Sequence, residues 1–422
     1  MSLASPTPNG ADAAVAKAKA GAPGRAAFAF IFVTVALDML ALGVMIPVLP
    51  KLVVQLEGGD MVRAAAVTGG FGFIWNAMQF LFSPVVGAAS DRLGRRPVVL
   101  LSNFGLGLDY ILMALAPNIG WLFAGRVISG ITAASFSSAT AYIADITPPE
   151  GRARLFGMIG AAFGLGFIVG PALGGFLGAV SLRLPFWVAA ALSLTNAAYG
   201  FFVLPESLPR ERRERFVWSK ANPLGSIDLL RSEPALLGLA LVAFIDYLAH
   251  ESLPSCFVLY ADYRYGWGEG RIGAVLATVG VAMAVVQALL VAPMVRAFGE
   301  RRAVLLGMAL GVVSLAVFGG APTGAIFMVG VPFVALWGIA GPAMQTLLTR
   351  RVGASEQGRL QGALGSLRGI GGMIGPVLFT QAFAAAIRPH VAVRVPGAPY
   401  LLAAALLAVG MAWAVRATRG DA

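Results

Sequence analysis

The connection between the second and third apolar blocks of this chain reads Gly87-Ala-Ala-Ser-Asp91-Arg92-Leu-Gly94-Arg95-Arg96-Pro97. It is a tight turn that places one carboxylate among three guanidinium groups. A basic loop that does no more than set membrane topology is the plain alternative, but such loops rarely combine this spacing of Gly, Asp and paired Arg. This turn is the most specific feature of the sequence, and the blocks on either side of it decide the fold class.

Those blocks are apolar and about 20 residues long, the length that crosses a hydrocarbon core about 30 Å thick. The chain of 422 residues is 58% hydrophobic and 12% charged, about half the charge of an average soluble domain. Its 53 glycines suit close packing of many membrane helices. We expect the bilayer to be the solvent, with twelve spans near residues 26–50, 66–88, 98–116, 120–143, 155–178, 183–204, 235–260, 270–292, 303–319, 323–348, 360–386 and 397–415.

Every second connection between these spans is basic, as in residues 91–96, 152–154, 210–220, 296–302 and 350–359. Positive loops stay in the cytoplasm, which places both termini inside. We therefore expect a multi-pass protein of a bacterial inner membrane. The net charge of +11 lies in these short loops, where it acts as a topology signal and not as a nucleic-acid surface.

Composition also divides the chain. Residues 1–24 are rich in Ala, Gly and Pro without an apolar core, which predicts a disordered cytoplasmic tail and not a signal peptide. The longest polar connection, 205–234, is expected to link a six-helix half at 25–204 to a second half at 235–416, followed by a short tail at 417–422.

An internal repeat supports this division. Gly170 and Pro171 recur as Gly375 and Pro376, a shift of 205 residues. The same shift relates Arg154 to Arg359, Gly157 to Gly362 and Gly94 to Gly299. Duplicated halves related by an axis along the membrane normal are a transporter plan. The sequence thus predicts an all-α membrane protein of twelve helices in two pseudo-symmetric halves.

The turn at residues 87–97 resembles the signature loop of the major facilitator superfamily. The resemblance implies a conformational latch between the halves, in which the carboxylate meets a helix N-terminus, where free N–H groups favour negative charge, and the arginines engage acids. Asp145, at the end of the fourth span, is the expected partner of Arg95. The implied latch residues are Gly87, Asp91, Arg92, Gly94, Arg95, Arg96 and Asp145.

The fifth span carries Gly164-Leu-Gly166-Phe-Ile-Val-Gly170-Pro171-Ala-Leu-Gly174-Gly175. This stretch resembles the motif typical of the antiporters of that family, which implies export. Physically it predicts a close helix crossing, as ordinary glycine packing also would. The implied packing residues are Gly166, Gly170, Pro171, Gly174 and Gly175. In the fourth span, Leu122-Phe-Ala-Gly-Arg126-Val-Ile-Ser-Gly130 is similar to a family motif with an intramembrane Arg.

The first span, with Gln79 and the pair Asp109-Tyr110, looks like the branch of tetracycline/proton antiporters. Its sequence is Asp38-Met-Leu-Ala-Leu-Gly43-Val-Met-Ile-Pro47-Val-Leu-Pro50. Two positions depart from that branch when the chain is aligned through Gln287 and residues 303–306. Met283 stands where the branch has a functional His, and Gly311 where it has an Asp. The resemblance therefore does not carry tetracycline over as the substrate.

Ionisable groups inside a bilayer cost about 2.5 to 3.5 kcal/mol each, so they usually line a cavity and serve function. Apart from Arg183 and Arg271 at span ends, seven fall inside the predicted spans: Asp38, Asp109, Arg126, Asp246, His250, Glu251 and Arg368. We expect Asp38, Asp109, Asp246, His250 and Glu251 to take part in proton coupling. His250 follows Asp246 by one helical turn, and this cluster could replace the missing His and Asp. The alternatives are fixed structural ion pairs, such as Arg368 with Asp246, and a packing role for the histidine.

A substrate cavity is expected near the bilayer midplane, where transporters of this plan hold substrate. Aromatic side chains there could bind an apolar compound, although lipid-facing packing is the competing role for each. The expected cavity residues are Trp75, Asn76, Gln79, Arg126, Met283, Gln287, Trp337, Gln345 and Arg368.

The function expected is proton-coupled export of a small hydrophobic or amphipathic compound, with the proton gradient as energy source and no cofactor, by a functional monomer. Uptake or facilitated transport of a polar metabolite by the same fold is the alternative, and a membrane sensor is a third. The chain has no Gly-Lys-Ser/Thr phosphate loop, so we expect no enzyme. Its one cysteine, Cys256, and its two histidines, His250 and His390, exclude a four-ligand zinc site and an internal disulfide.

Overall fold

The computed structural model describes residues 22–133, 135–147, 149–213, 225, 227–231, 234–391 and 393–418. Of the predicted tail at 1–24, residues 1–21 lie outside the described residues, and 22–24 open the first helix. Parts of the predicted linker, 214–224, 226 and 232–233, and residues 419–422 of the last tail also lie outside. Ten stretches of the described residues are long and apolar enough to span a membrane, from Ile31–Leu56 to Ala398–Ala417.

The first half begins with a helix that breaks at the proline pair Pro47 and Pro50, because proline lacks the N–H that a helix interior requires. Asp60 then caps the next helix by accepting the N–H groups of Val62 and Arg63. The helices of this half are α2 (Ala22–Met45), α3 (Leu49–Leu56), α4 (Met61–Leu93), α5 (Arg95–Leu115), α6 (Ile119–Ala133), α7 (Ser135–Ile146), α8 (Pro149–Val180) and α9 (Leu184–Val203).

The second half contains one apolar stretch, Glu269–Gly320, that is long enough to cross twice. It turns at Gly299, whose φ of 76° favours glycine. The elements of this half are α10 (Asp228–Arg231), α11 (Pro234–His250), α12 (Ser252–Tyr265), α13 (Glu269–Val285), a π-helical segment η3 (Val286–Leu290), α14 (Val291–Gly320), α15 (Gly324–Trp337), α16 (Ala340–Thr349), α17 (Gln357–Ile387) and α18 (Ala398–Ala417).

With α6 and α7 forming the fourth crossing, and with the turn at Gly299 dividing the eighth from the ninth, the predicted twelve-helix plan is confirmed. Some predicted boundaries were wrong. The seventh and tenth crossings are each interrupted, by Glu251 and by residues 338–339. The eighth, predicted to end at 292, continues as helix to the bend at Gly299.

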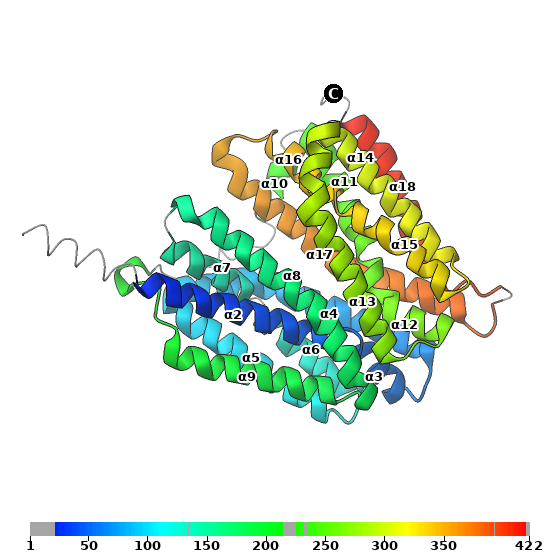
Figure 1. Cartoon of the computed structure of the whole chain (residues 1–422), viewed down its shortest axis with the longest axis horizontal. Helices are drawn as coiled ribbons and strands as arrows, with labels where there is room; N and C mark the ends of the chain where they lie inside the picture. Colours follow the sequence, from blue (N-terminus) through cyan, green and yellow to red (C-terminus); the bar gives the residue numbers. More distant parts are fainter. Residues whose placement is uncertain are drawn as a thin grey trace, which may run out of the picture.

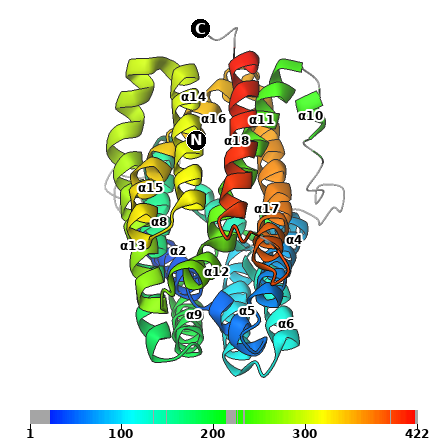
Figure 2. The same cartoon turned by 90° about the vertical axis from the view of Figure 1, so that its right-hand side faces the viewer.

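The most extensive contacts between the halves are those of α4 with α17 and of α8 with α13, and α12 adds smaller contacts with α3 and α4. Glycines allow these backbones to touch: a β-carbon added to Gly72 would lie 2.5 Å from Cβ of Pro376, and one on Gly175 would lie 2.9 Å from Cα of Gly273. Figure 2 shows the second half standing on the first, with α17 beside α4.

The two ends of the bundle differ. The end that carries residues 91–97, 205–213, 296–302 and 350–359 is called the basic end here, and the end that carries residues 57–60, 116–118, 181–183, 266–268 and 321–323 is called the opposite end. In Figure 1 the halves diverge toward the basic end, where α7 of the first half is far from α16 of the second, and meet toward α3 and α12.

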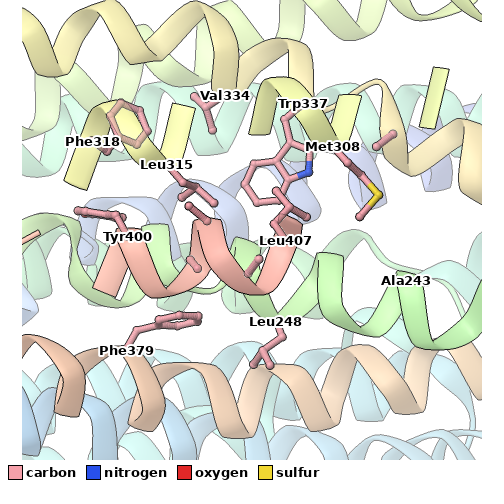
Figure 3. Packing of buried hydrophobic residues seen from close by; sticks show 14 of the residues in the cluster. Ala243, Leu248, Met308, Leu315, Phe318, Val334, Trp337, Phe379, Tyr400 and Leu407 are labelled. Atoms are coloured by element: carbon pink, nitrogen blue, oxygen red, sulfur yellow. The ribbon is translucent and has the colours of Figure 1, made fainter. Parts of the chain in front are cut away.

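The core of the second half is a large aromatic and aliphatic cluster. Phe318 and Phe327 stack with ring centroids 4.2 Å apart, and the Tyr260 hydroxyl donates to the carbonyl of Phe318 at 2.8 Å. Figure 3 shows Trp337, Met308 and Leu407 grouped at one end of this cluster, near Leu248 of α11. The core therefore extends to Trp337, which contacts Asp246.

Candidate functional site

The ionisable residues of the seventh crossing meet an aromatic side chain of the tenth. The indole Nε1 of Trp337 donates to Oδ1 of Asp246 at 2.8 Å, and the rings of His250 and Trp337 are 5.0 Å apart in an edge-to-face arrangement. Trp337 is only 3% exposed, so its core packing holds the donor in place. The structure thus brings together three residues that the sequence assigned separately to coupling and to the cavity.

Both helices that supply this cluster are interrupted beside it. α11 ends at His250 and α12 begins at Ser252, while α15 ends at Trp337 and α16 begins at Ala340. The N–H groups at both interruptions stay bonded within the chain, that of Glu251 to the carbonyl of Tyr247 at 3.2 Å and that of Gly338 to the carbonyl of Ala335 at 3.1 Å, so each interruption is a local distortion of one crossing. A small pocket of about 10 Å³ adjoins Asp246 and is lined by Ala243, Asp246, Tyr247, Met308, Ala340, Gly341 and Met344.

Arg368 of α17 does not neutralise Asp246 directly. Its guanidinium carbon lies 4.7 Å from the centroid of the Tyr247 ring. Within the described part of the chain, no ion pair to Asp246 lies within 4 Å, so the predicted structural pair is not formed in this conformation. Glu251 packs against α17, the helix that carries Arg368. A β-carbon added to Gly375 of α17 would lie 2.4 Å from Cβ of Glu251.

In the first half, Asp38 lies beside Asn196, in a second cluster of polar side chains. The Thr34 hydroxyl donates to Oδ1 of Asn196 at 3.1 Å, joining α2 to α9, and Thr34 and Asn196 are both buried. One oxygen of Asp38 is buried without a hydrogen-bond partner among the described residues. An unpaired buried carboxylate oxygen is costly, which favours water or a proton at this position.

Asp109 and Arg126 lie inside the first half, between α5 and α6. Asp109 is 1% exposed and Arg126 is 8% exposed, and no described group hydrogen-bonds either oxygen of Asp109. The Arg126 guanidinium lies over the ring of Trp75, 5.4 Å from its centroid. Two residues expected in the substrate cavity, Arg126 and Trp75, are therefore paired with each other.

The remaining residues expected in the cavity are spread over both halves. Asn76 lies in the contact between α4 and α17, where its Nδ2 donates to the carbonyl of Gly72 at 2.9 Å. Gln287 is exposed on the π-helical segment, and such segments are frequent at functional sites. Gln79, Met283 and Gln345 are partly exposed, and Met283 also packs on the core of the second half.

At the basic end, Arg95 joins the turn to the rest of the first half. Its guanidinium pairs with Asp91 at 2.5 Å and with Asp145 at 3.1 Å, as the sequence predicted for Asp145. It also donates to the Ser90 hydroxyl at 2.6 Å, while its backbone N–H donates to Glu206 at 2.9 Å. Asp91, Asp145 and Ser90 belong to the first half and Glu206 lies at the start of the linker, so no partner comes from the second half and the turn is braced locally in this conformation.

The two glycines of the turn differ in role. Gly94 has a φ of 108°, and a β-carbon there would lie 2.2 Å from Oε2 of Glu206, so only glycine fits. Gly87 has open space around it. Arg96 donates to the carbonyl of Phe201 at 2.5 Å, and Arg92 is exposed.

The glycine motif of α8 forms two different contacts. Gly166, Gly170 and Gly174 pack on α2, and a β-carbon on Gly170 would lie 2.7 Å from Cα of Gly43. Gly175 instead faces α13 of the other half, where the carbonyl of Pro171 also approaches Gly273. The motif therefore supports both the first half and its contact with the second.

Sequence reasoning missed a cluster that ties the halves together at the opposite end. Lys51 Nζ pairs with Asp262 at 3.2 Å and with Glu269 at 3.3 Å, and it donates to the carbonyl of Trp267 at 2.8 Å. Each of these charged residues lies at the end of an apolar span, where a charged side chain is ordinarily solvated, so the sequence offers no reason to pair them. Only the fold brings the three residues together across more than 200 positions.

Comparison with known proteins agrees with this architecture. The sequence profile of the Major Facilitator Superfamily matches residues 31–376 and 239–419. Tetracycline resistance protein class C of Escherichia coli is 38% identical over 83% of this chain and 88% of that protein. Tetracycline resistance protein class G of Vibrio anguillarum is 36% identical over the same shares.

Solved structures share the fold. The human organic anion transporter MFSD10 (TETRAN) superposes with a TM-score of 0.66 at 24% identity, covering 93% of this chain and 99% of that one. A bacterial homolog of the human lysosomal transporter Spinster superposes with a TM-score of 0.76 at 16% identity, covering 94% and 97%. With its two six-helix halves, its turn at residues 87–97 and these relatives, the chain belongs to the major facilitator superfamily of membrane transporters and is related to the tetracycline resistance proteins.

Proposed function

We propose that this transporter exports a small hydrophobic or amphipathic compound in exchange for protons, by alternating access of the two halves. The relatives named for tetracycline resistance and the glycine motif of α8 support export. We place the basic end in the cytoplasm because positive loops remain on that side. In this assignment the structure is the form in which the halves diverge toward the cytoplasm and close outside.

The hydrogen bond from Trp337 to Asp246 is the observation that carries the coupling role. It holds the Asp246 carboxylate of the seventh crossing at the interruption of the tenth, where a change of helix packing would alter its surroundings. Arg368 is close enough to act on this carboxylate without forming an ion pair, so a shift of α17 against α11 would change whether the carboxylate holds a proton. Asp246 is the main coupling group in this proposal, with His250 beside it.

Asp38 serves as the second coupling group, in the first half. Unlike Asp246, which has Arg368 nearby, Asp38 has no neutralising cation among its described partners, and one of its buried oxygens accepts no hydrogen bond. Asp109 differs, because it lies beside Arg126 in the interior of the first half. We assign that pair to packing and to positioning Trp75.

The substrate is not expected to be recognised as tetracycline is by the related branch. Met283 supplies no titratable group, and Gly311 leaves room that the Trp337 indole fills. The groups that remain near Asp246 are an indole, an imidazole, a phenol and the guanidinium of Arg368. Such a set suits a planar, mostly apolar compound that carries a single hydrogen-bonding group.

The test is transport in everted membrane vesicles loaded with a pH-sensitive dye. Addition of the transported compound to energised vesicles should release protons from the lumen, which reports substrate, direction and coupling together. Transport that continues unchanged after the pH gradient is collapsed would remove the coupling. Movement of a polar metabolite in the opposite direction would instead establish the uptake alternative.

A further inference from the structure

A groove of about 940 Å³ lies on the outer face of the first half, between α5 and α9 near the basic end. Its wall is mostly apolar and includes Leu100, Leu101, Phe104, Leu194 and Phe201. Three charged side chains, Arg96, Glu206 and Arg213, stand at the end of the groove that is nearest the basic loops.

The groove faces the bilayer and not the other half. Leu101 is 71% exposed, Phe104 is 49% exposed and Phe201 is 62% exposed, although each is a large apolar side chain in a membrane helix. The main neighbours of α5 and α9 are α2, α4, α6, α7 and α8, all of the first half. The groove is thus separate from the cluster around Asp246.

The charges at its end leave positive charge uncompensated. Glu206 is satisfied within the protein, since it accepts the N–H groups of Arg95 and Leu208 at 2.9 and 3.0 Å and lies 3.6 Å from Arg213. Arg96 has no such partner. It donates to the carbonyl of Phe201 and lies over that ring at 5.8 Å, while its Nε is buried without a hydrogen-bond partner among the described residues.

We propose that this groove binds an anionic phospholipid of the leaflet at the basic end. An acyl chain would lie along Leu101 and Phe104, and the phosphate would accept from Arg96, with Arg213 adding a second positive charge. An arginine at the edge of an apolar groove, with no carboxylate paired to it among the described residues, matches the chemistry of such a lipid, which joins hydrocarbon to a phosphate at the interface. A free phosphate would lack the chains that the wall accommodates.

The site has a consequence for the basic turn. Arg95 binds Asp91, Asp145 and Ser90, and Arg96 is the next residue in the chain. A lipid headgroup bound to Arg96 would therefore lie directly beside the contacts of Arg95. The lipid would therefore stabilise the first half at the turn. It acts at a distance from Asp246 and does not depend on which compound is transported.

Native mass spectrometry of the full-length protein, released from nanodiscs of phosphatidylglycerol mixed with phosphatidylcholine, tests this proposal. We expect wild type to retain phosphatidylglycerol in preference to phosphatidylcholine, and Arg96→Gln to retain about fivefold less, as expected for one arginine at an anionic surface. Arg92→Gln is the matched control: this exposed arginine lies at the end of α4, four residues before Arg96, and does not line the groove.

A second pair of variants tests the apolar wall without changing charge. Ala198 lines the groove, whereas Ala191 is exposed on α9 two turns away and does not. Ala198→Trp should displace the lipid and Ala191→Trp should not, with both variants checked for an unchanged monodisperse elution. Glycerol phosphate, which has the headgroup chemistry without chains, should not compete. Equal retention in wild type, Arg96→Gln and Ala198→Trp, or displacement by glycerol phosphate alone, would overturn the proposal.

Discussion

The indole of Trp337 stands directly against Gly311: a β-carbon built on Gly311 would lie 2.6 Å from Cδ2 of the ring. That distance is well inside van der Waals contact, so no larger residue fits at 311 while Trp337 keeps its place. The same indole donates to Asp246. An aspartate at position 311 and the Trp337–Asp246 hydrogen bond therefore exclude each other while Trp337 keeps its place.

Gly311→Asp should accordingly destabilise the protein, since overpacking a core typically costs about 1–3 kcal/mol and the new carboxylate would also need a partner. Thermal unfolding in detergent should show a lowered midpoint, and Gly311→Asp with Trp337→Gly should recover part of the loss. Gly365→Ala is the control, because nothing lies within 4 Å of a β-carbon there. A midpoint for Gly311→Asp equal to that of the control would show that Trp337 moves aside freely.

Replacing Asp246 separates proton coupling from binding. Asp246→Asn retains an oxygen that can accept the Trp337 N–H but removes the titrating proton. With His250→Gln in the same chain, accumulation against a gradient in vesicles should be lost while downhill exchange continues. Asp109→Asn is the comparison, since that residue lies away from the interface between the halves. Undiminished accumulation in the double variant would leave Asp38 as the remaining coupling group.

Neutralising the basic turn should affect the rate of turnover more than substrate affinity. Asp91 pairs with Arg95 at the protein surface, away from Asp246, and exposed ion pairs contribute about 0–1 kcal/mol to stability. Asp91→Asn should lower the maximal transport rate several-fold at normal expression, with the half-saturating concentration nearly unchanged. Glu211→Gln, which neutralises an exposed carboxylate outside the turn, is the control. Parallel losses of rate and affinity would place Asp91 at the substrate site.

Breaking the ion pairs at the opposite end should shift the conformational equilibrium. Lys51 is the cation for both Asp262 and Glu269, and its side chain is 10% exposed, so Lys51→Met removes two partly buried pairs that join the halves. We expect the population open at the opposite end to rise about fivefold to tenfold, as a loss of roughly 1–1.4 kcal/mol would produce.

Spin labels at Pro117 and His390 would report this shift. These two residues lie in exposed connections, one in each half, and the native Cys256 is buried. Pulsed electron resonance should show a longer distance component that grows in Lys51→Met and remains small in Arg63→Met, whose ion pair with Asp60 stays within one half. Identical distance distributions in the two variants would show that Lys51 does not hold the halves closed.

The sequence alone determined the class of the protein and its large-scale plan. Apolar blocks of membrane-spanning length and alternating basic loops are local properties, and so the helices could be placed to within a few residues. The 205-residue repeat predicted two halves, and the spacing in residues 87–97 predicted the pairing of Arg95 with Asp145. His250 and Asp246 could be grouped because one helical turn separates them.

The tertiary structure decided which distant side chains meet. No local pattern connects Trp337 to Asp246 or to Gly311, and none connects Lys51 to Glu269, because these contacts depend on how helices cross and rotate. Hydrophobicity places a helix in the membrane but is nearly uniform around it, so only side-chain packing between helices selects the face that each one turns to its partner.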